Sequence, residues 1–331
     1  MRIEVTELRA VATETEIPIA ELAEIIEQAV ASAYIKHLVN NKLDAPKDSD
    51  VRAQLDQKTG DLGVFRKEYN EDGEYTGEVV ADVEGFGRIA ANAAKQVIAS
   101  RLRELSDDAV LRHYKDREGQ QISGVVKQGP NPRMVHVDLG DVEAILPPEE
   151  QVPGEEYPHG RRIRVYITGV SKGLRGTQVT VSRTHPGLVK RLFELEVPEL
   201  AEEIVEIVSV AREAGYRSKV AVRSNRPEVN AKGCFIGEMG RRVRAVMSQL
   251  GEEKIDLIDY SSDLTEFVAN ALSPAKVSDV FMLNAEEKKV RVLVPDFQLS
   301  LAIGKEGQNA RLAAKLTGAK IDIQADSVME S

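Results

Sequence analysis

Two glycine pairs with the same spacing are the residues of this sequence best suited to binding chemistry. The stretch Ile236-Gly237-Glu238-Met239-Gly240-Arg241-Arg242-Val243-Arg244 is matched 67 residues later by Ile303-Gly304-Lys305-Glu306-Gly307-Gln308-Asn309-Ala310-Arg311. A Gly-x-x-Gly turn between helices lets another chain approach the backbone closely, because glycine has no Cβ and accepts a positive φ. The helix that follows points its free N–H groups and its positive dipole end at the turn, which suits a phosphate group. The pattern therefore predicts a clamp for a phosphate backbone at each pair.

The same elements are expected on either side of both glycine pairs. Each pair is preceded by a strand and followed by an apolar helical stretch, a glycine (Gly251 or Gly318) and a second strand. The expected strands lie at residues 220–222 and 254–258 in the first copy and at residues 290–294 and 320–323 in the second. This order resembles the KH module, whose loop holds about four nucleotides of single-stranded RNA. A tight interhelical turn without a ligand is the alternative for a single copy, and the repetition of the whole pattern disfavours it.

Basic residues gather around the first glycine pair. Between Arg212 and Arg244, nine Lys and Arg stand against three acidic residues, a local net charge of +6. Because the arginines directly follow the loop, we favour phosphate contacts over a merely solvated helix face. In the second copy Lys305 and Arg311 are expected to take this role, while Gln308 and Asn309 could hydrogen-bond base edges. The RNA-binding residues predicted from the two loops are Gly237, Glu238, Met239, Gly240, Arg241, Arg242, Arg244, Gly304, Lys305, Glu306, Gly307, Gln308, Asn309 and Arg311.

The glycines and the apolar residues after them are expected to have different roles. Val243, Val246, Met247 and Leu250 recur at helical spacing and are predicted to be core. The glycines are expected to contact the ligand, so that replacing Gly304 and Gly307 with Asp should remove most RNA binding without unfolding the chain.

The sequence pattern of residues 118–184 is typical of a small β-barrel. Short β-rich runs, separated by Gly, Pro and Asn clusters, lie at residues 121–127, 133–138, 142–146, 162–170 and 177–182. They predict a closed barrel of the OB type, with an SH3-like barrel as the alternative. Its candidate RNA contacts are Lys127, Arg133, His136, Arg161, Arg162, Arg164 and Arg175. Because the segment has only Tyr157 and Tyr166 for base stacking, these contacts should be mainly electrostatic and weak, and simple solvation is the alternative.

Residues 1–117 predict an α+β unit. Apolar residues at helical spacing after Pro18 indicate a helix to about Leu38, and strands are expected at residues 51–55, 63–69 and 78–83. A long Ala- and Leu-rich helix is expected from Arg88 to about Lys115. Residues 85–90 fit the dinucleotide pattern G-x-G-x-x-A, but the helix continues where that fold needs a second parallel strand. We therefore predict no nucleotide site here.

Composition limits the class of protein. The 331 residues are 42% hydrophobic and 30% charged, which is typical of soluble globular proteins with two or three domains. The net charge of -10 disfavours nucleic acid as a ligand, yet -7 of it falls in residues 1–117 and none in residues 118–184.

Several classes of site are not expected. The one cysteine, Cys234, and five dispersed histidines predict neither an internal disulfide nor a metal cluster. No Walker motif, Gly-x-Ser-x-Gly elbow or supported carboxylate pair occurs, so we expect no cofactor, no metal and no catalytic residues. The absence of a long apolar run or a signal core predicts a cytoplasmic protein without a membrane contact.

The domain order and several motifs resemble the NusA family of bacterial transcription elongation, termination and antitermination factors. The motifs are the hairpin from Val51-Arg52 to Phe65-Arg66, residues 84–90, residues 236–240 and, above all, residues 294–313. The resemblance covers essentially the whole chain and implies a multidomain α+β protein with an amino-terminal domain and connector helix (1–117), an OB-fold barrel (118–184) and two tandem prokaryotic-type (type II) KH domains (185–276 and 277–331).

The resemblance also implies a function. Residues 1–117 would dock on core RNA polymerase near the RNA exit channel, and residues 118–331 would receive nascent single-stranded RNA. The protein would modulate pausing, intrinsic termination and antitermination together with other termination and antitermination factors, as a monomer without enzymatic activity. The alternatives are an RNA-recruiting subunit of an RNA-processing nuclease and an adapter that binds proteins only.

The chain departs from the family pattern in places. Residues 229–235 stand where the family often has Asp-Pro-Val-Gly-Ala, and Ala319 stands where it often has Trp. Because the sequence ends soon after Ile323, the form without carboxy-terminal acidic repeats is expected.

Overall fold

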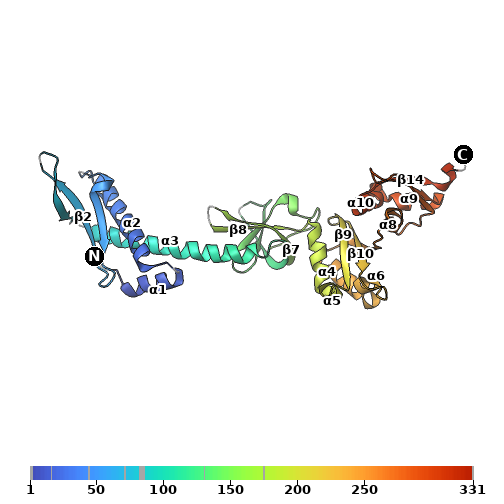
Figure 1. Ribbon diagram of the computed structural model, residues 1–331, viewed down its shortest axis with the longest axis horizontal. Coiled ribbons are helices and arrows are strands. Elements are labelled where there is room, and N and C mark those ends of the chain that lie inside the picture. Colours follow the sequence, from blue (N-terminus) through green and yellow to red (C-terminus); the bar gives the residue numbers. More distant parts are fainter. Residues whose placement is uncertain are drawn as a thin grey trace. The chain divides into compact units, whose positions relative to one another are not determined.

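The chain forms two compact units. The computed structural model describes residues 3–15, 17–43, 45–70, 72–81, 86–129, 131–173 and 176–329. It divides into the units Met1–Val110 and Leu111–Ser331. The boundary falls within helix α3 (Phe86–Lys115) (Figure 1). This is the long helix that the sequence predicts from Arg88 to about Lys115, and it begins two residues earlier. Among the helices of the described ranges, none has the length and the apolar character that crossing a bilayer requires.

The first unit packs helices on an antiparallel sheet. Its other elements are α1 (Val5–Thr15), α2 (Ile19–Asn40), β1 (Val51–Leu55), β2 (Leu62–Tyr69) and β3 (Tyr75–Val80), with the strands in the order β1-β2-β3. In β1 every second residue is buried, and this face packs with Leu22, Ile26 and Val30 of α2 in one apolar core. The predicted strand at residues 51–55 is confirmed. The third strand begins earlier than predicted, because Tyr75 already pairs with Tyr69, and residues 82–83 lie outside the described residues.

The second unit begins with a closed barrel. Its strands are β4 (Gln121–Lys127), β5 (Val135–Asp138), β6 (Glu143–Leu146), β7 (Arg162–Gly173) and β8 (Gly176–Ser182), in the order β4-β5-β6-β8-β7. The pairing of β6 with β8 is parallel and the other pairings are antiparallel. Inward-facing Val137, Val165, Ile167 and Val181 are fully buried. The prediction of a closed OB-like barrel is confirmed.

Two modules of the same topology follow the barrel. The first contains α4 (Pro186–Glu196), α5 (Pro198–Ala201), β9 (Val205–Glu213), β10 (Arg217–Ser224), α6 (Ala231–Ile236), α7 (Arg241–Gln249) and β11 (Lys254–Asp259). The second contains α8 (Leu264–Ala271), β12 (Asp279–Asn284), β13 (Lys289–Val294), α9 (Leu299–Ile303), α10 (Gln308–Thr317) and β14 (Lys320–Ala325). In each, an antiparallel strand pair is extended by one parallel strand, in the sheets β11-β10-β9 and β12-β13-β14.

The barrel and the two modules are tied together inside this unit. Arg183 is buried where barrel and first module meet, pairs with Glu155 at 2.6 Å and donates to the carbonyls of Arg164 and Gln249. Between the modules, Ser209 Oγ donates to the carbonyl of Leu316 at 3.1 Å. Apolar residues of both modules, among them Ala211, Ile258, Ala313 and Leu316, also form one continuous core.

Candidate nucleic-acid interface

The first glycine of each pair is required by the loop itself. Gly237 (φ 69°, ψ 174°) and Gly304 (φ 78°, ψ 172°) share a backbone conformation that residues with a side chain rarely adopt. A Cβ on Gly237 would lie 2.6 Å from Arg242 Cγ, and one on Gly304 would lie 2.8 Å from the backbone nitrogen of Asn309. Replacing Gly304 with Asp is therefore expected to disturb the loop as well as the ligand, so Gly307 is the better site for a substitution.

The second glycine of each pair begins the following helix and has room around it. Gly240 (φ 76°) and Gly307 (φ 73°) are left-handed, and nothing lies within 4 Å of a Cβ built on Gly307. In the described structure no side chain caps the N-termini of α7 or α10. The backbone N–H groups of Arg241 and Gln308 already donate to the carbonyls of Glu238 and Lys305, so the sequence-based expectation of a phosphate site applies to the later amide groups of each first turn and to the positive end of the helix dipole.

One residue in each copy fastens the loop to the preceding helix. Arg242 Nη1 donates to the carbonyl of Cys234 at 2.7 Å and to the carboxylate of Glu199 at 2.9 Å. Asn309 Nδ2 donates to the carbonyls of Leu272 (2.9 Å) and Ala302 (3.0 Å). Asn309 is also buried, which disfavours its predicted contact with base edges. The guanidinium of Arg242 is held in place by these bonds, which gives it a structural role that the sequence did not indicate.

The positive charge around the first loop is largely neutralised in three dimensions. Ion pairs in the described structure engage most of the basic residues between 212 and 244: Arg212–Glu253, Arg217–Asp256, Lys219–Asp256, Arg223–Glu206, Lys232–Asp259 and Arg242–Glu199. Lys219 is wholly buried, and burial lowers the pKa of its ammonium group. Arg226, Arg241 and Arg244 are exposed and have no ion-pair partner among the described residues. The expected phosphate contacts of this loop therefore narrow to Arg241 and Arg244.

The second loop has a different electrostatic setting. Lys305 is exposed, but Gln308 and Arg311 both reach back to Glu213 at the end of β9 in the first module. Gln308 Nε2 lies 2.9 Å from Glu213 Oε2, and Arg311 Nε lies 2.6 Å from Glu213 Oε1. The hydrogen bond from Arg311 lowers the pKa of the Glu213 carboxyl. No signal in the sequence connects Glu213 with residues 95 and 98 positions away.

Apolar side chains stand exposed beside both loops. Met239 within the first loop is 87% exposed, and Phe297, just before α9, is 80% exposed. Ile236 and Ile303, which directly precede the first glycines, are exposed as well. Unstacked bases pack on such surfaces, and an aromatic ring such as Phe297 can stack with any base. Phe297 was not among the residues predicted; its signal is an aromatic residue in a polar turn next to the loop motif.

The core positions predicted after the first loop are mostly confirmed. Val246 and Leu250 are buried, and Val243 is partly buried against the same cluster. Met247 lies at intermediate depth.

The barrel contributes few free cations. Lys127 pairs with Asp138 at 2.8 Å, His136 Nδ1 with Glu143 at 2.6 Å and Arg161 with Glu155 at 3.4 Å, while Arg164 donates to Gln121. The hydrogen bond to Asp138 raises the pKa of Lys127. Of the predicted barrel contacts within the described residues, Arg133 and Arg162 are exposed without such a partner, and Arg175 lies outside the described residues.

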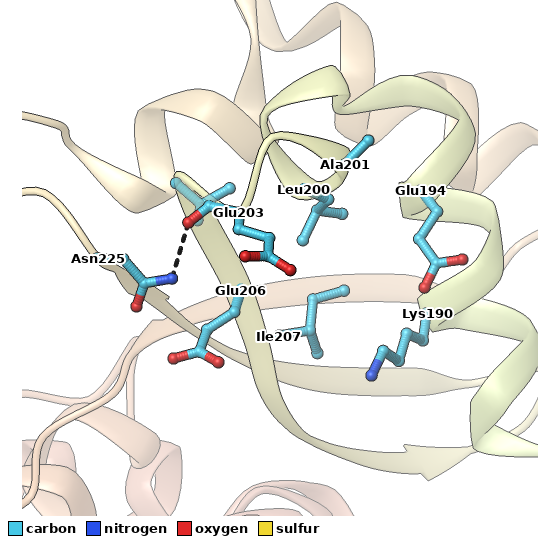
Figure 2. A pocket seen from close by; sticks show the side chains of 9 residues that line it. Lys190, Glu194, Leu200, Ala201, Glu203, Glu206, Ile207 and Asn225 are labelled. Carbon is cyan, nitrogen blue, oxygen red and sulfur yellow. Dashed lines mark hydrogen bonds between the residues drawn. The ribbon is translucent and has the colours of Figure 1, made fainter.

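Two hollows on the first module differ in character. One hollow of about 590 Å³ is lined by residues of α4, α5, β9 and the segments next to these elements. Figure 2 shows the carboxylates of Glu194, Glu203 and Glu206 around it, and the Asn225 side-chain amide donates to the backbone carbonyl of Glu203. Carboxylates repel phosphate, so this hollow does not suit an RNA backbone. A hollow of about 540 Å³ lies beside the first loop and includes Gly237 and Arg241. Across the described ranges, no group of three or more His, Cys, Asp and Glu side chains is placed to hold a metal ion.

Family models match three parts of the chain. Residues 5–69 match the NusA N-terminal domain, residues 183–260 match the NusA-like first KH domain, and residues 264–331 match the NusA-like second KH domain. The two modules that carry the glycine loops are thus similar to tandem KH domains.

Curated relatives match nearly the full chain. The transcription termination/antitermination protein NusA of Mycobacterium tuberculosis is 49% identical over 334 residues, which cover 99% of this chain and 94% of the relative. The protein of the same name from Bacillus subtilis is 46% identical, covering 92% of this chain and 86% of the relative. That of Thermus thermophilus is 40% identical, covering 98% and 90%.

Proposed function

This chain belongs to the NusA family, and from that premise we propose that it is an RNA-binding transcription termination and antitermination factor without catalytic activity. It docks on core RNA polymerase through residues 1–117 and contacts nascent single-stranded RNA through residues 118–331. It acts as a monomer in the cytoplasm, together with other termination and antitermination factors. The observation that carries the proposal is the pair of Gly-x-x-Gly loops with matching backbone, each next to a helix N-terminus without a side-chain cap. Membership of this family disfavours the nuclease subunit.

The geometry suggests how RNA is held. Phosphates lie at the N-terminal ends of α7 and α10, with Arg241, Arg244 and Lys305 beside them, and bases lie on Met239 and Phe297. With few free cations, each loop binds weakly. Because the two modules that carry the loops share one apolar core, binding at one loop raises the effective concentration of RNA at the other. The tandem therefore binds more tightly than either loop alone.

Neutralising the free arginines of the first loop should flatten the salt dependence of RNA binding. The double variant Arg241→Gln with Arg244→Gln is expected to reduce the slope of log affinity against log salt by up to ~0.7 per lost phosphate contact. A titration with fluorescent single-stranded RNA between low and high salt measures the slope. Arg223→Gln is the control, because Arg223 is paired with Glu206. Equal slopes in the double variant and the parent chain would contradict phosphate contacts at these residues.

Removing the first unit should separate the two binding functions. Its β2–β3 edge exposes apolar and aromatic side chains at Tyr69, Tyr75, Val79 and Val80, which favours contact with protein, and its net charge disfavours RNA. A chain that lacks residues 1–110 is expected to lose co-purification with core polymerase and to keep its RNA affinity, because the second unit has its own cores. Retained polymerase binding would refute the assignment. An adapter that binds proteins only would bind polymerase but no RNA.

A further inference from the structure

The second Gly-x-x-Gly loop already has an anion beside it. Glu213 of β9 accepts hydrogen bonds from Arg311 Nε (2.6 Å) and Gln308 Nε2 (2.9 Å), both in the first turn of α10. Arg311 Nη1 also donates to the carbonyl of Glu306, within the loop, at 3.1 Å. The guanidinium thus lies between the loop and a carboxylate supplied by the other KH domain.

The first loop has no such partner. Arg244 follows its second glycine by four positions, as Arg311 does in the second copy. Its guanidinium also lies at the loop, because Arg244 Nη1 is 3.6 Å from a Cβ built on Gly240. Within the part of the chain that the structure describes, however, Arg244 makes no ion pair and is exposed. Equivalent arginines are therefore free in one copy and neutralised in the other.

We propose that the Glu213 carboxylate stands in for an RNA phosphate at the second KH loop, and that RNA must displace it to bind there. The proposal rests on the RNA-binding function proposed above. Carboxylate and phosphate oxygens compete for the same guanidinium N–H groups, so the two cannot both use Arg311 fully. The first loop is open to RNA in the free chain, whereas the second is held closed by its neighbour.

The surroundings of Glu213 allow this exchange. Its side chain is 18% exposed and that of Arg311 is 48% exposed, so the pair lies at the rim of the interface and water can reach the released carboxylate. The contact between the domains does not depend on this pair, because the Ser209–Leu316 hydrogen bond and the shared apolar core lie elsewhere in the interface. RNA can therefore open the pair without separating the domains.

Glu213→Gln tests the proposal in the full chain, because it keeps the shape of the side chain and removes its charge. In the parent chain RNA gains the Arg311 contact only where it has displaced the carboxylate, whereas a freed Arg311 makes this phosphate contact in every complex. Affinity for single-stranded RNA should therefore rise, and the salt slope should steepen by up to ~0.7, which is about fivefold in affinity per tenfold change in salt. Glu206→Gln is the matched control: it also removes one negative charge from β9 and frees an arginine, Arg223, but not at a glycine loop. Its slope should not change.

The double variant Glu213→Gln with Arg311→Gln shows whether any gain acts through Arg311, since the gain should then disappear. Weaker or unchanged binding by Glu213→Gln, with an unchanged slope, overturns the proposal and leaves Glu213 as an interface residue only. A gain that survives in the double variant, or that Glu206→Gln reproduces, overturns it as well. If the parent chain itself binds no single-stranded RNA, the proposed function fails, which is a separate result.

Discussion

The double variant Gly240→Asp with Gly307→Asp is expected to bind short single-stranded RNA about 100-fold more weakly than the parent chain. Each Asp places a negative charge where the amide groups of α7 or α10 would meet a phosphate, and hydrogen bonds to a charged group contribute about 1.5–3 kcal/mol. The lower value is about tenfold in affinity at each loop. Both positions have space for a Cβ, so the chain should remain folded. Fluorescence anisotropy measures the affinity, and circular dichroism checks the fold.

The chain offers a matched control for this variant. Gly251 (φ 77°) and Gly318 (φ 70°) lie just beyond the carboxyl ends of the same two helices, have the same left-handed backbone and have nothing within 4 Å of a built Cβ. Gly251→Asp with Gly318→Asp therefore adds the same charge and the same backbone strain, away from the loops. Equal losses of affinity in the two double variants would mean that strain or net charge, rather than the loops, explains the effect.

The largest loss of stability is expected at Glu253. Its carboxylate is wholly buried and accepts hydrogen bonds from Arg212 (2.8 Å to Nη2), from the backbone nitrogen of Gly215 (2.9 Å) and from Ser218 Oγ (2.7 Å). Glu253→Ala would leave the buried guanidinium without its counter-ion. Breaking a buried pair in this way costs about 3–5 kcal/mol.

Urea unfolding followed by circular dichroism measures this loss in the full chain. Glu252→Ala is the control, because the neighbouring side chain is exposed and surface substitutions usually change the free energy of unfolding by less than about 0.5 kcal/mol. Similar unfolding midpoints for the two variants would show that the buried pair adds little to the stability of the first KH domain.

Much of the architecture could be predicted because its signals are local. The alternation in residues 51–55 and the short β-rich runs of the barrel depend on neighbouring residues, and the structure has strands at these places. The glycine loops were located because the backbone conformation itself requires glycine at Gly237 and Gly304. Helix α1 was not predicted, since among its described side chains only Leu8, Val11 and Ala12 are apolar and buried, too few to give a clear helical spacing.

The electrostatics of the candidate site could not be predicted in the same way. A charge count along the sequence treats each arginine as free, whereas Arg212 meets Glu253 from 41 positions away and Arg311 meets Glu213 from 98. The structural role of Asn309 was missed for a related reason, because only the folded loop shows that its amide faces the carbonyls of Leu272 and Ala302. Pairing between distant segments is decided by packing, which no local pattern records.

The different fastenings of the two loops predict different responses to salt. The first loop depends on the ion pair between Arg242 and Glu199, which mobile ions weaken as their concentration rises. The second is joined to its preceding helix by neutral amide bonds from Asn309, which mobile ions affect little, and its ionic contact is the outer pair of Arg311 with Glu213. We therefore expect added salt to loosen the fastening of the first loop more than that of the second.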